Sequence, residues 1–385
     1  MSRVRLPQVN LLIKPASSGC DLRCRYCFYA DVAANRAIPN YGLMSEETLE
    51  RLVAAAFATA EHRVGFSFQG GEPTLVGLPF YRRLIALEEK YNTRRLPVQH
   101  AIQTNGMHLD HAWARFFREQ RFLVGLSLDG HARSHDRYRV DARGAGTHAR
   151  VLAAARLLQQ EHVEFNILSV VTAELARRIT GIYAWLRDQG FGYLQFIPAI
   201  DDFGLEAGCA AEWSLTAEAY GDFLCRLFDL WYEDYRRGRY VSIRHFDNWI
   251  QLLRGREPES CALRGVCSAY GVVEADGSVH PCDFYVLDEW QLGHIESDGL
   301  GAMLTGEVAE RFVRLSLNKD PACDSCPWFG ICRGGCRRDA EPLLSDPDRP
   351  GGLRLSANRF CAAYKRFFPH ALGRMQAIAR ELGPL

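Results

Sequence analysis

Cysteine spacing is the feature that most restricts what this chain can fold into. Eleven of its thirteen cysteines fall into two groups, and the first group is Cys20-x3-Cys24-x2-Cys27. The second group runs from Cys261 to Cys361 and holds eight cysteines. Three thiolates can bind only three irons of a four-iron cubane, which leaves one iron open, whereas eight thiolates suffice for two closed cubanes. We therefore expect three iron–sulfur clusters, one of which has an open iron.

Zinc is the alternative metal for both groups, because soft thiolates suit zinc as well as iron–sulfur clusters. A structural zinc site takes four protein ligands. The segment 19–40 offers no further cysteine or histidine beyond the three cysteines, so we expect iron there. Two zinc sites remain the alternative for the eight later cysteines.

Length and charge exclude several classes of protein. The 385 residues allow two or three domains. Basic and acidic residues both number 46, and no basic run suggests nucleic acid or an anionic membrane as a partner. The start of the chain lacks a signal-peptide pattern, and no run approaches the roughly 18 apolar residues of a membrane helix. We expect a soluble, cytoplasmic protein with reduced thiols.

Apolar, β-branched runs alternate with amphipathic segments in the first half of the chain, which predicts strands alternating with helices. The expected strands are 9–14, 64–69, 98–103, 122–128, 165–171 and 193–197. Helices are expected over 78–91, 110–119, 147–161 and 175–189, and after Ser45, an N-cap with Glu46 and Glu47 behind it. Six such repeats imply a parallel sheet that curls into a full or partial barrel, with functional loops at the carboxyl ends of the strands.

The alternation stops after Pro198. A Gly- and acid-rich loop, 199–212, leads to a long aromatic helix over 216–236. From Cys261 the elements become short, as in a module whose fold is set by metal, with a hairpin of 272–274 and 279–281. We expect an α/β fold of three parts: a partial barrel of six strand–helix units over 1–200, a helical linker over 201–260, and a loop-rich cluster domain with a C-terminal helix over 261–385.

The first cysteine group, with Phe28 behind it and Gly70-Gly71-Glu72-Pro73 after the second strand, resembles the radical S-adenosylmethionine enzymes. The resemblance implies that the open iron binds the amino and carboxylate groups of S-adenosylmethionine. The Gly-Gly-Glu-Pro segment would contact the amino group, since glycines allow close backbone approach and oxygens accept from an ammonium.

Further cofactor contacts are implied by position at the strand ends. In the family Ser127 would contact the ribose and Arg139 would reach the cofactor carboxylate. The alternative for each is a polar residue that caps a helix or turn. The implied cofactor-binding set is Tyr26, Phe28, Gln69, Gly70, Gly71, Glu72, Pro73, Gln103, Asn105, Ser127, Asp129, Arg139 and Gln195.

The second cysteine group resembles the SPASM extension of radical S-adenosylmethionine enzymes that modify peptides and proteins. Its pattern is Cys267-x9-Gly277-x4-Cys282, then Cys323-x2-Cys326-x5-Cys332-x3-Cys336, then Cys361. Eight ligands allow many partitions. The family pattern implies that one auxiliary cluster is held by Cys261, Cys267, Cys282 and Cys336, and the other by Cys323, Cys326, Cys332 and Cys361.

Three segments narrow the resemblance to the anaerobic sulfatase-maturating enzymes: 12–20 (LIKPASSGC), 68–74 (FQGGEPT) and 282–287 (CDFYVL). The family oxidises a cysteine or serine in a C/S-x-P/A-x-R sequence of a sulfatase to formylglycine. A 5'-deoxyadenosyl radical takes a hydrogen atom from the side-chain β-carbon. The implied partners are an unfolded or nascent sulfatase segment and an electron donor such as flavodoxin or ferredoxin.

Asp283 is the residue that the resemblance makes the general base. It follows Cys282 directly and would accept the proton that the substrate radical loses, while an auxiliary cluster accepts the electron. The alternative is a solvated turn aspartate, like Asp276.

Two other readings of the chain remain. One is a SPASM enzyme that cross-links or epimerises a ribosomal peptide; such enzymes often have an extra N-terminal domain, whereas nineteen residues precede Cys20 here. The other is a non-catalytic electron carrier or zinc-organised binding module. Position after the last strand makes Asp201, Asp202 and Glu206 candidates for binding a substrate arginine, but the favoured alternative is a solvated acidic loop. Cys209 fits no motif, and Cys225 is expected to be a buried thiol within the aromatic helix.

Overall fold

The computed structural model describes residues 4–203, 211–346 and 352–383. Contacts divide the chain into two compact units. The first consists of Met1–Leu128, Asp136–Asn166 and Ala269–Phe312, and the second of Asp129–His135, Ile167–Ser268 and Val313–Leu385. Each unit thus combines distant parts of the sequence. The division at residues 200 and 260 stays a prediction, as does the closure of all six strands into one barrel.

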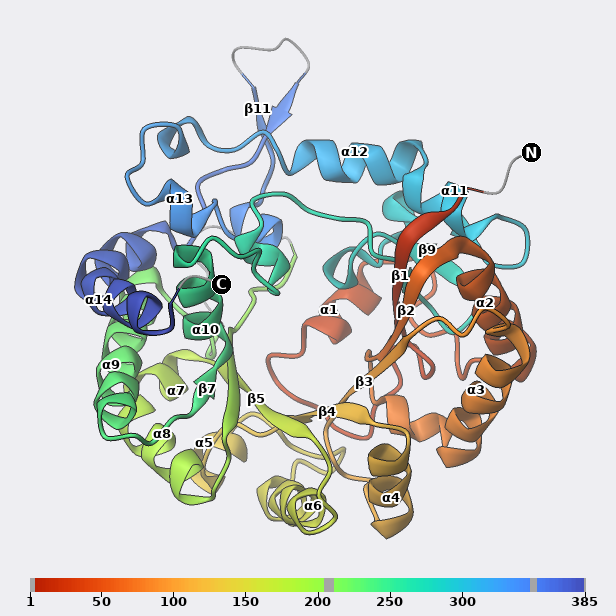
Figure 1. Cartoon of the computed structure of the whole chain (residues 1–385), viewed down its shortest axis with the longest axis horizontal. Helices are drawn as coiled ribbons and strands as arrows, with labels where there is room; N and C mark the ends of the chain where they lie inside the picture. The colour runs from red at the N-terminus through yellow and green to blue at the C-terminus, as the bar shows by residue number, and fades with distance from the viewer. Residues whose placement is uncertain (1–3, 204–210, 347–351, 384–385) are drawn as a thin grey trace. The chain divides into compact units, whose positions relative to one another are not determined.

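The first unit is built on a parallel sheet, which confirms the expected α/β class. The strands β1 (Leu6–Ile13), β2 (Ala60–Phe68), β3 (Val98–Thr104) and β4 (Phe122–Ser127) are neighbours in that order. The helices α2 (Glu46–Thr59), α3 (Leu78–Tyr91) and α4 (His111–Glu119) lie along one side of these strands (Figure 1). The other helices of this unit are α1 (Phe28–Ala34), α6 (His148–Gln160), α11 (Leu300–Thr305) and the 3-10 turns η1 (Pro73–Val76), η3 (Asp283–Tyr285) and η4 (Asp288–Trp290).

A C-terminal hairpin extends this sheet beyond β1. Its strands are β8 (Val272–Val273) and β9 (Ser278–His280), and β10 (Gly293–His294) pairs with β9. Gly277 closes the turn at φ +99° and donates its N–H to the Glu274 carbonyl at 3.0 Å. The hairpin is therefore confirmed. Its parallel pairing with β1, where Leu12 faces Val272, joins residues 260 positions apart and is a finding of the structure.

The helices of the first unit begin where their sequences predict. The side chain of Ser45 caps α2 by accepting from the Thr48 N–H at 3.0 Å, and the acidic residues of the first turn face the positive end of the helix. Asp110 caps α4 by accepting from the N–H groups of Ala112 and Trp113. Both caps fix a helix directly after a loop that leaves the sheet.

The second unit has three parallel strands, β5 (Phe165–Val171), β6 (Tyr193–Pro198) and β7 (Ser242–Ile243). Its helices are α5 (Ala132–His135), α7 (Ala173–Arg177), α8 (Ile179–Asp188), α9 (Ala217–Arg236), α10 (Arg244–Leu253), α13 (Phe329–Cys332) and α14 (Cys361–Glu381). Its 3-10 turns are η2 (Cys261–Leu263), η5 (Pro321–Cys323) and η6 (Arg337–Ala340), and β11 (Leu344–Ser345) pairs with β12 (Leu353–Arg354). The helix α12 (Glu307–Leu315) runs from the first unit into the second.

The single helix expected over 175–189 is wrong, because the structure has two helices there. Thr172 starts α7 by accepting from the Leu175 N–H at 3.2 Å. The chain leaves helical geometry at Arg178, with φ −104° and ψ 8°, and α8 follows. An early cap and one non-helical residue thus replace a continuous helix.

Each unit has its own aromatic core. In the first, Phe68, Tyr81 and Phe122 are at most 1% exposed and contact one another edge-on or stacked. In the second, α9, α10 and α14 pack around Trp231 and Trp249. Cys225 on α9 is half-buried, so the expectation of a fully buried thiol is wrong. Cys225 lies next to the buried Leu224 on α9, at the edge of the core and not at its centre.

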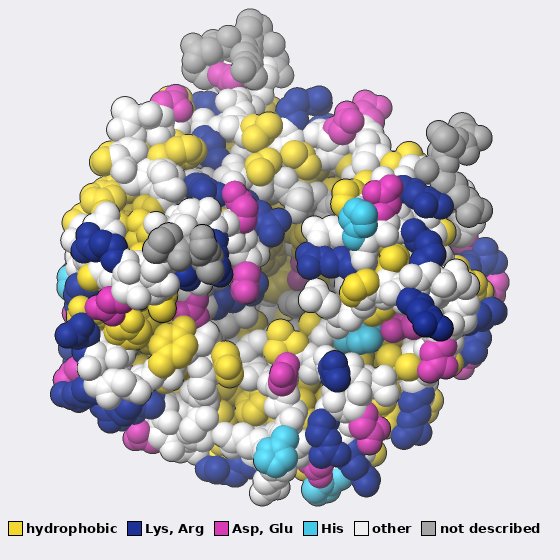
Figure 2. Space-filling view, viewed as in Figure 1, with side chains coloured by type: hydrophobic (Ala, Val, Ile, Leu, Met, Phe, Trp, Pro, Cys, Tyr) yellow, Lys and Arg dark blue, Asp and Glu magenta, His cyan; other side chains and the backbone are white. Residues whose placement is uncertain are grey.

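The surface is mixed in charge. Lys and Arg side chains are interspersed with Asp and Glu on the face in view (Figure 2). Among the described residues, no helix combines the length and the apolar character needed to cross a membrane.

Three buried charges meet where the hairpin joins β1. Glu274 is 0% exposed, and its Oε1 lies 3.2 Å from Lys14 Nζ and 2.8 Å from Arg36 Nη1. Burial by itself would raise the pKa of Glu274, but the two cations outweigh burial and lower it to about 2. Arg36 also donates to the Ser17 hydroxyl at 3.2 Å. One carboxylate therefore ties the hairpin to the end of β1.

We expect Glu274→Gln to lower the free energy of unfolding by about 3 kcal/mol or more, because it leaves Lys14 and Arg36 buried without a counter-charge. Anaerobic denaturant unfolding measures this loss. Glu47→Gln is the control, since it breaks only the exposed pair with Arg51 (2.7 Å) and should change stability by less than about 1 kcal/mol. Equal midpoints for the two variants would contradict this account of the buried charges.

Candidate active site

The loop of residues 20–27 carries the three N-terminal cysteines and is fixed by backbone pairing. Leu22 forms a bridge with Asp141, and the Arg23 N–H donates to the Val140 carbonyl at 2.7 Å. The helix α1 begins immediately after the loop. The three thiols are therefore presented by a loop that is pinned at its middle and capped by a helix.

The chemistry of this donor set fits a metal cluster. All three cysteines are free and half-buried. Burial raises the pKa of Cys20 to about 12, although the Leu22 N–H donates to its sulfur at 3.4 Å. A thiolate in this loop therefore needs a bound metal to stabilise its charge. No three His, Cys, Asp or Glu side chains of the described ranges converge as the ligands of one ion would; in a cubane each thiolate binds a different iron.

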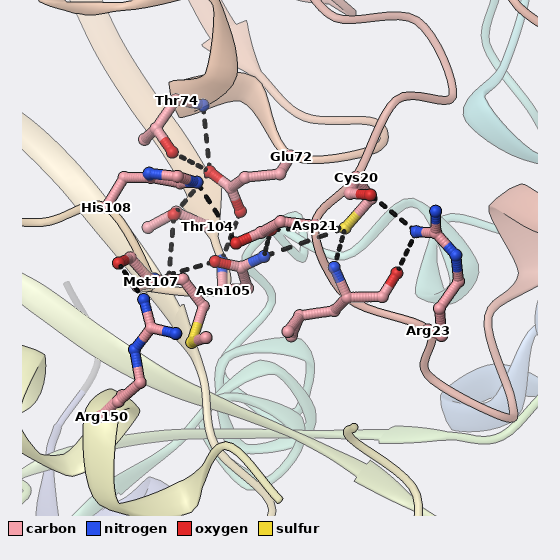
Figure 3. Close-up of polar contacts among 12 residues, drawn as sticks. Cys20, Asp21, Arg23, Glu72, Thr74, Thr104, Asn105, Met107, His108 and Arg150 are labelled. Atoms are coloured by element: carbon pink, nitrogen blue, oxygen red, sulfur yellow. Dashed lines mark hydrogen bonds and ion pairs between the residues drawn. The ribbon is translucent and has the colours of Figure 1, made fainter. Parts of the chain in front are cut away.

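Glu72 fastens the loop after β2 to the loop after β3 (Figure 3). Its Oε1 accepts from the Thr74 N–H at 3.0 Å, the Thr74 hydroxyl at 2.6 Å and the Thr104 hydroxyl at 2.8 Å. Its Oε2 accepts from the Asn105 N–H at 2.7 Å. Four donors match the roughly four lone-pair sites of a carboxylate. Burial raises the pKa of Glu72 and the hydrogen bonds oppose that rise. The carboxylate is thus engaged inside the protein.

Asn105 connects the same loops to the cysteine loop (Figure 3). Its Nδ2 lies 2.7 Å from Asp21 Oδ1 and 3.8 Å from Cys20 Sγ. His108 Nε2 lies 3.2 Å from the other oxygen of Asp21. The ends of β1, β2 and β3 therefore form one hydrogen-bonded group around the first cysteine.

The glycines of the Gly-Gly-Glu-Pro segment are required by the packing of the protein itself. A Cβ on Gly71 would lie 2.0 Å from the carbonyl oxygen of Gly19, and one on Gly70 would lie 2.5 Å from Lys14 Cε. Both glycines have positive φ, +97° and +49° in sequence order. The Glu72 N–H donates to the same Gly19 carbonyl at 2.7 Å. Close approach to the cysteine loop, and not only to a ligand, explains these two residues.

Most of the other implied cofactor residues lie in the first unit. Gln103 donates to the Ser127 hydroxyl at 2.9 Å. The Arg139 guanidinium stands 5.5 Å above the Tyr26 ring, and its Nη1 is 3.9 Å from Cys24 Sγ. These contacts join the end of β3 to the end of β4, and Arg139 to the cysteine loop.

Three implied residues have structural contacts of their own at the ends of β1 and β2. The Gln69 N–H donates to the Ile13 carbonyl at 3.0 Å. Pro73 accepts at its carbonyl from the Tyr81 hydroxyl at 2.9 Å, and the ring of Phe28 meets Phe284 edge-on at 4.9 Å.

Asp129 and Gln195 belong to the second unit. Asp129 is 2% exposed and accepts from the Val170 N–H at 2.9 Å, while Gln195 lies on β6. Their part in a site with first-unit residues stays a prediction, as do the ligand roles of the whole set.

Asp283 is a buried carboxylate and not a solvated turn residue. It is 7% exposed, its Oδ2 accepts from the Tyr29 hydroxyl at 2.5 Å, and its N–H donates to the Tyr270 hydroxyl at 2.9 Å. Its Oδ1 is buried and has no hydrogen-bond partner among the described residues. Burial raises the pKa of Asp283, while Lys14 and Tyr29 act in the opposite direction. Asp283 thus has one buried oxygen without a hydrogen-bond partner among the described residues. Its other oxygen is bound to Tyr29, which lies two residues after the third cysteine.

Sequence reasoning gave Tyr29, with Phe28, only the role of a flat side chain that could cover a cofactor, and it assigned no role to Tyr270 or Lys14. The Lys14 ammonium lies 4.7 Å above the Tyr29 ring, and Tyr29 itself follows Phe28 in the first turn of α1. The sequence shows both the motif that contains Lys14 and the aromatic pair at 28–29. It does not show that they lie together, because that depends on the β1–β8 pairing, which forms only in the folded protein.

The second unit gathers four of the later cysteines. Burial, with smaller contributions from the charges of Cys361, Cys323 and Cys326, raises the pKa of Cys332 to about 11. Cys323 in turn is affected by Cys361 and Cys326. The turn at 323–326 is closed by the Cys326 N–H, which donates to the Cys323 carbonyl at 3.2 Å. These four thiols are electrostatic neighbours.

The remaining later cysteines are divided between the units. Burial raises the pKa of Cys267, and Cys261 adds to the rise. Cys336 also lies in the second unit, whereas Cys282 precedes Asp283 in the first. A cluster shared by these four cysteines stays a prediction.

Asp201 has partners within the protein and is not a purely solvated residue, and a part for it in binding a substrate arginine stays a prediction. It is ion-paired with Arg359 and accepts from the Ser214 hydroxyl at 2.7 Å. Asp202 is described and has contacts of its own. Glu206 and Cys209 lie outside the described residues.

We expect Glu72→Gln to destabilise the protein by about 1–3 kcal/mol, because the amide would point a donor at groups that already donate. Anaerobic thermal or denaturant unfolding measures this loss. Glu119→Gln, on the exposed face of α4, is the matched control and should lie within about 0.5 kcal/mol of the parent. If Glu72→Gln is as stable as that control, the carboxylate does not fasten the two loops.

Comparison with known families agrees with this arrangement. A family model described as the radical SAM superfamily matches residues 15–175. A second, described as an iron-sulfur cluster-binding domain and named SPASM, matches residues 264–327. The two matches fall on the two cysteine groups.

Whole-chain relatives are more specific. The cysteine-type anaerobic sulfatase-maturating enzyme of Clostridium novyi is 44% identical over 98% of this chain and 99% of its own length. That of Clostridium perfringens is 42% identical over 98% and 100%. The serine-type enzyme of Klebsiella pneumoniae is 32% identical over 98% and 90%.

A solved structure, native anSMEcpe with bound AdoMet and Cp18Cys peptide, superposes with a TM-score of 0.91 at 41% identity, covering 98% of this chain and 100% of that one. Streptococcus suis SuiB with S-adenosylmethionine reaches a TM-score of 0.60 at 18% identity, which is a likeness of fold alone. Identity above 40% over the full length, together with both domain matches, shows that this chain belongs to the anaerobic sulfatase-maturating enzymes of the radical SAM superfamily.

Proposed function

We propose that this chain oxidises a cysteine in a C-x-P/A-x-R segment of a sulfatase to formylglycine. The choice of cysteine over serine is supported by identity: the relatives at 42–44% are named cysteine-type, whereas the serine-type relatives are at 30–33%. Cross-linking or epimerisation of a ribosomal peptide has no such support from a relative that matches the chain over its full length.

The proposed cofactors are three 4Fe-4S clusters and S-adenosylmethionine. The loop cysteines Cys20, Cys24 and Cys27 would hold the cluster with the open iron, and the implied cofactor-binding set would hold S-adenosylmethionine beside it. When bound, these groups supply a 5'-deoxyadenosyl radical that removes a hydrogen atom from the substrate β-carbon, and they take up the second electron.

The later cysteines would hold the two auxiliary clusters in the interleaved pattern that the family implies. The electrostatic neighbourhood of Cys323, Cys326, Cys332 and Cys361 supports that set. For the other set, the neighbourhood of Cys261 and Cys267 is the supporting observation.

The observation that carries the proposal is the buried, unpartnered Oδ1 of Asp283. The substrate radical must lose one proton and one electron to become a thioaldehyde, and water then releases sulfide to leave the aldehyde. Oδ1 is where the proton goes, since Oδ2 is occupied by the Tyr29 hydroxyl. Tyr29, on α1, orients the carboxylate by donating to Oδ2, and the Tyr270 hydroxyl holds the backbone of Asp283 by accepting from its N–H. Burial among aromatic rings keeps water from competing for that oxygen.

The proposed partner is a sulfatase segment in an unfolded or nascent state, and the electron donor is a flavodoxin or ferredoxin. An extended segment is required because the target side chain must reach a buried carboxylate. We place the reaction in the cytoplasm, where thiols stay reduced.

We expect the reconstituted enzyme, with S-adenosylmethionine and a reductant under anaerobic conditions, to convert a C-x-P-x-R peptide to its formylglycine form, with 5'-deoxyadenosine as co-product. The serine peptide should react more slowly. Asp283→Asn should still cleave S-adenosylmethionine but should lower aldehyde yield by about 10²-fold or more, because the proton acceptor is lost. Mass spectrometry of peptide and nucleoside measures all three.

Asp276→Asn is the matched control. Asp276 lies in the turn of the hairpin that precedes Asp283, and its side chain caps that turn by accepting from the Ser278 N–H. It should keep the parent yield. Cleavage of S-adenosylmethionine without any change in either peptide would overturn the proposed substrate. Equal yields from the Asp283 and Asp276 variants would overturn the proton acceptor.

We expect Cys361→Ala to lose up to about four of about twelve irons per chain, since it removes one of the four thiolates proposed to hold the second auxiliary cluster. Iron and sulfide analysis after anaerobic reconstitution measures this. Cys225→Ala, which removes a half-buried thiol of α9, should keep the full content. An unchanged iron content in Cys361→Ala would remove this residue from the ligand set.

A further inference from the structure

Lys319 is a half-buried lysine among the cysteines of the second unit. It lies between α12 and η5, and the groups that act on its charge are the thiols of Cys267, Cys336, Cys323 and Cys332. The first two belong to one proposed auxiliary ligand set and the last two to the other. A single ammonium is thus within electrostatic reach of both sets.

The ammonium is held in place through Ser316. Lys319 Nζ donates to the Ser316 carbonyl at 2.7 Å. The Ser316 hydroxyl accepts from the Cys267 N–H at 2.9 Å and donates to the Val313 carbonyl at 2.6 Å. Ser316 is 1% exposed. The same buried serine therefore fixes both the lysine and one of the cysteines.

The stem of Lys319 packs on the loop between Cys332 and Cys336. A Cβ on Gly334 would lie 2.7 Å from Lys319 Cδ and 2.9 Å from its Cε. Gly334 has φ +84°, and its neighbours Arg333 and Gly335 also have positive φ. The left-handed turn brings the backbone against the lysine stem, so the charge is positioned by the segment that links the two cysteines.

No carboxylate of the described residues forms an ion pair with Lys319. The adjacent Asp320 instead pairs with Arg354 at 3.2 Å, and Arg337, the other cation that acts on Cys267, pairs with Glu341 at 3.5 Å. A half-buried cation is costly unless an anion compensates it. Here the compensating anions are thiolates, and thiolate-ligated cubanes carry net negative charge that increases on reduction.

We propose that Lys319 is a shared positioning charge that stabilises the reduced form of both auxiliary clusters. The proposal rests on the ligand sets given under the proposed function. In the reaction, the substrate radical gives its proton to Asp283 and its electron to the second unit, and a fixed cation there makes the electron's arrival more favourable. Lys319 touches neither substrate nor reacting atoms, so its effect is on potential.

The test is a redox titration of the auxiliary clusters alone. The parent is a variant in which Cys20, Cys24 and Cys27 are all alanine, which removes the N-terminal cluster. In that background Lys319→Met should shift the reduction equilibrium about tenfold toward the oxidised form, which for one electron is a midpoint lower by about 59 mV. Electron paramagnetic resonance or absorbance against a poised potential measures it.

Two further variants control for packing and for charge at large. Lys319→Arg keeps the charge and should keep the parent midpoints. Lys365→Met removes an exposed lysine of α14, and it should also keep them. A midpoint shift in Lys319→Met that is absent from Lys319→Arg supports the role of the charge. A shift of equal size in both Lys319 variants would mean that packing, and not charge, is responsible, and it would overturn the proposal.

Iron and sulfide content separates the remaining outcomes. If the triple-alanine parent holds no iron, the auxiliary ligand sets are wrong and the proposal falls with them. If Lys319→Met keeps its iron and its midpoints are those of the parent, the proposal alone is overturned. If Lys319→Met loses iron, the residue serves cluster assembly and not potential, which also overturns it.

Discussion

The carboxylate of Glu274, shared by Lys14 and Arg36, is the interaction on which the first unit depends. Lys14 directly follows β1, and Glu274 directly follows β8, so their contact locks the register of a parallel pair formed by distant segments. The cysteine loop leaves from the Lys14 end, and Asp283 follows from the hairpin. Because both depart from the same locked junction, Asp283 and the cysteine loop are fixed relative to each other by backbone geometry, with Tyr29 as the direct link.

A second, smaller constraint keeps the strand-end loops together. The Glu72 carboxylate has four donors from two loops, while Gly71 allows the backbone to meet Gly19. A side chain on Gly71 would separate the segment from the cysteine loop. The Gly-Gly-Glu-Pro segment of this chain is therefore held rigidly by its own carboxylate and by close backbone packing.

Local sequence patterns predicted the parts of this molecule, and distant pairing decided how they act. The alternation of strands and helices, the Ser45 cap and the 272–281 hairpin followed from periodicity and turn chemistry, and they were right. The split at Arg178 was missed because one residue of non-helical backbone leaves no compositional trace. The partner of Asp201 could not be identified from the sequence, because Arg359 is 158 positions away. The roles of Lys14 and Lys319 could not be read from the chain, since each depends on groups brought together only by folding.

In the proposed oxidation, the substrate radical loses a proton and an electron, which have opposite charges and go to different parts of the protein. In the proposed reaction, Asp283 would take up the proton at Oδ1 and lose its charge, a change that burial favours. Burial raises the pKa of Asp283, and Lys14, which lies beside Tyr29, acts in the opposite direction. The electron would add negative charge to the second unit, where Lys319 has no carboxylate partner among the described residues. In this proposal, the proton and the electron of one carbon radical go to separate acceptors.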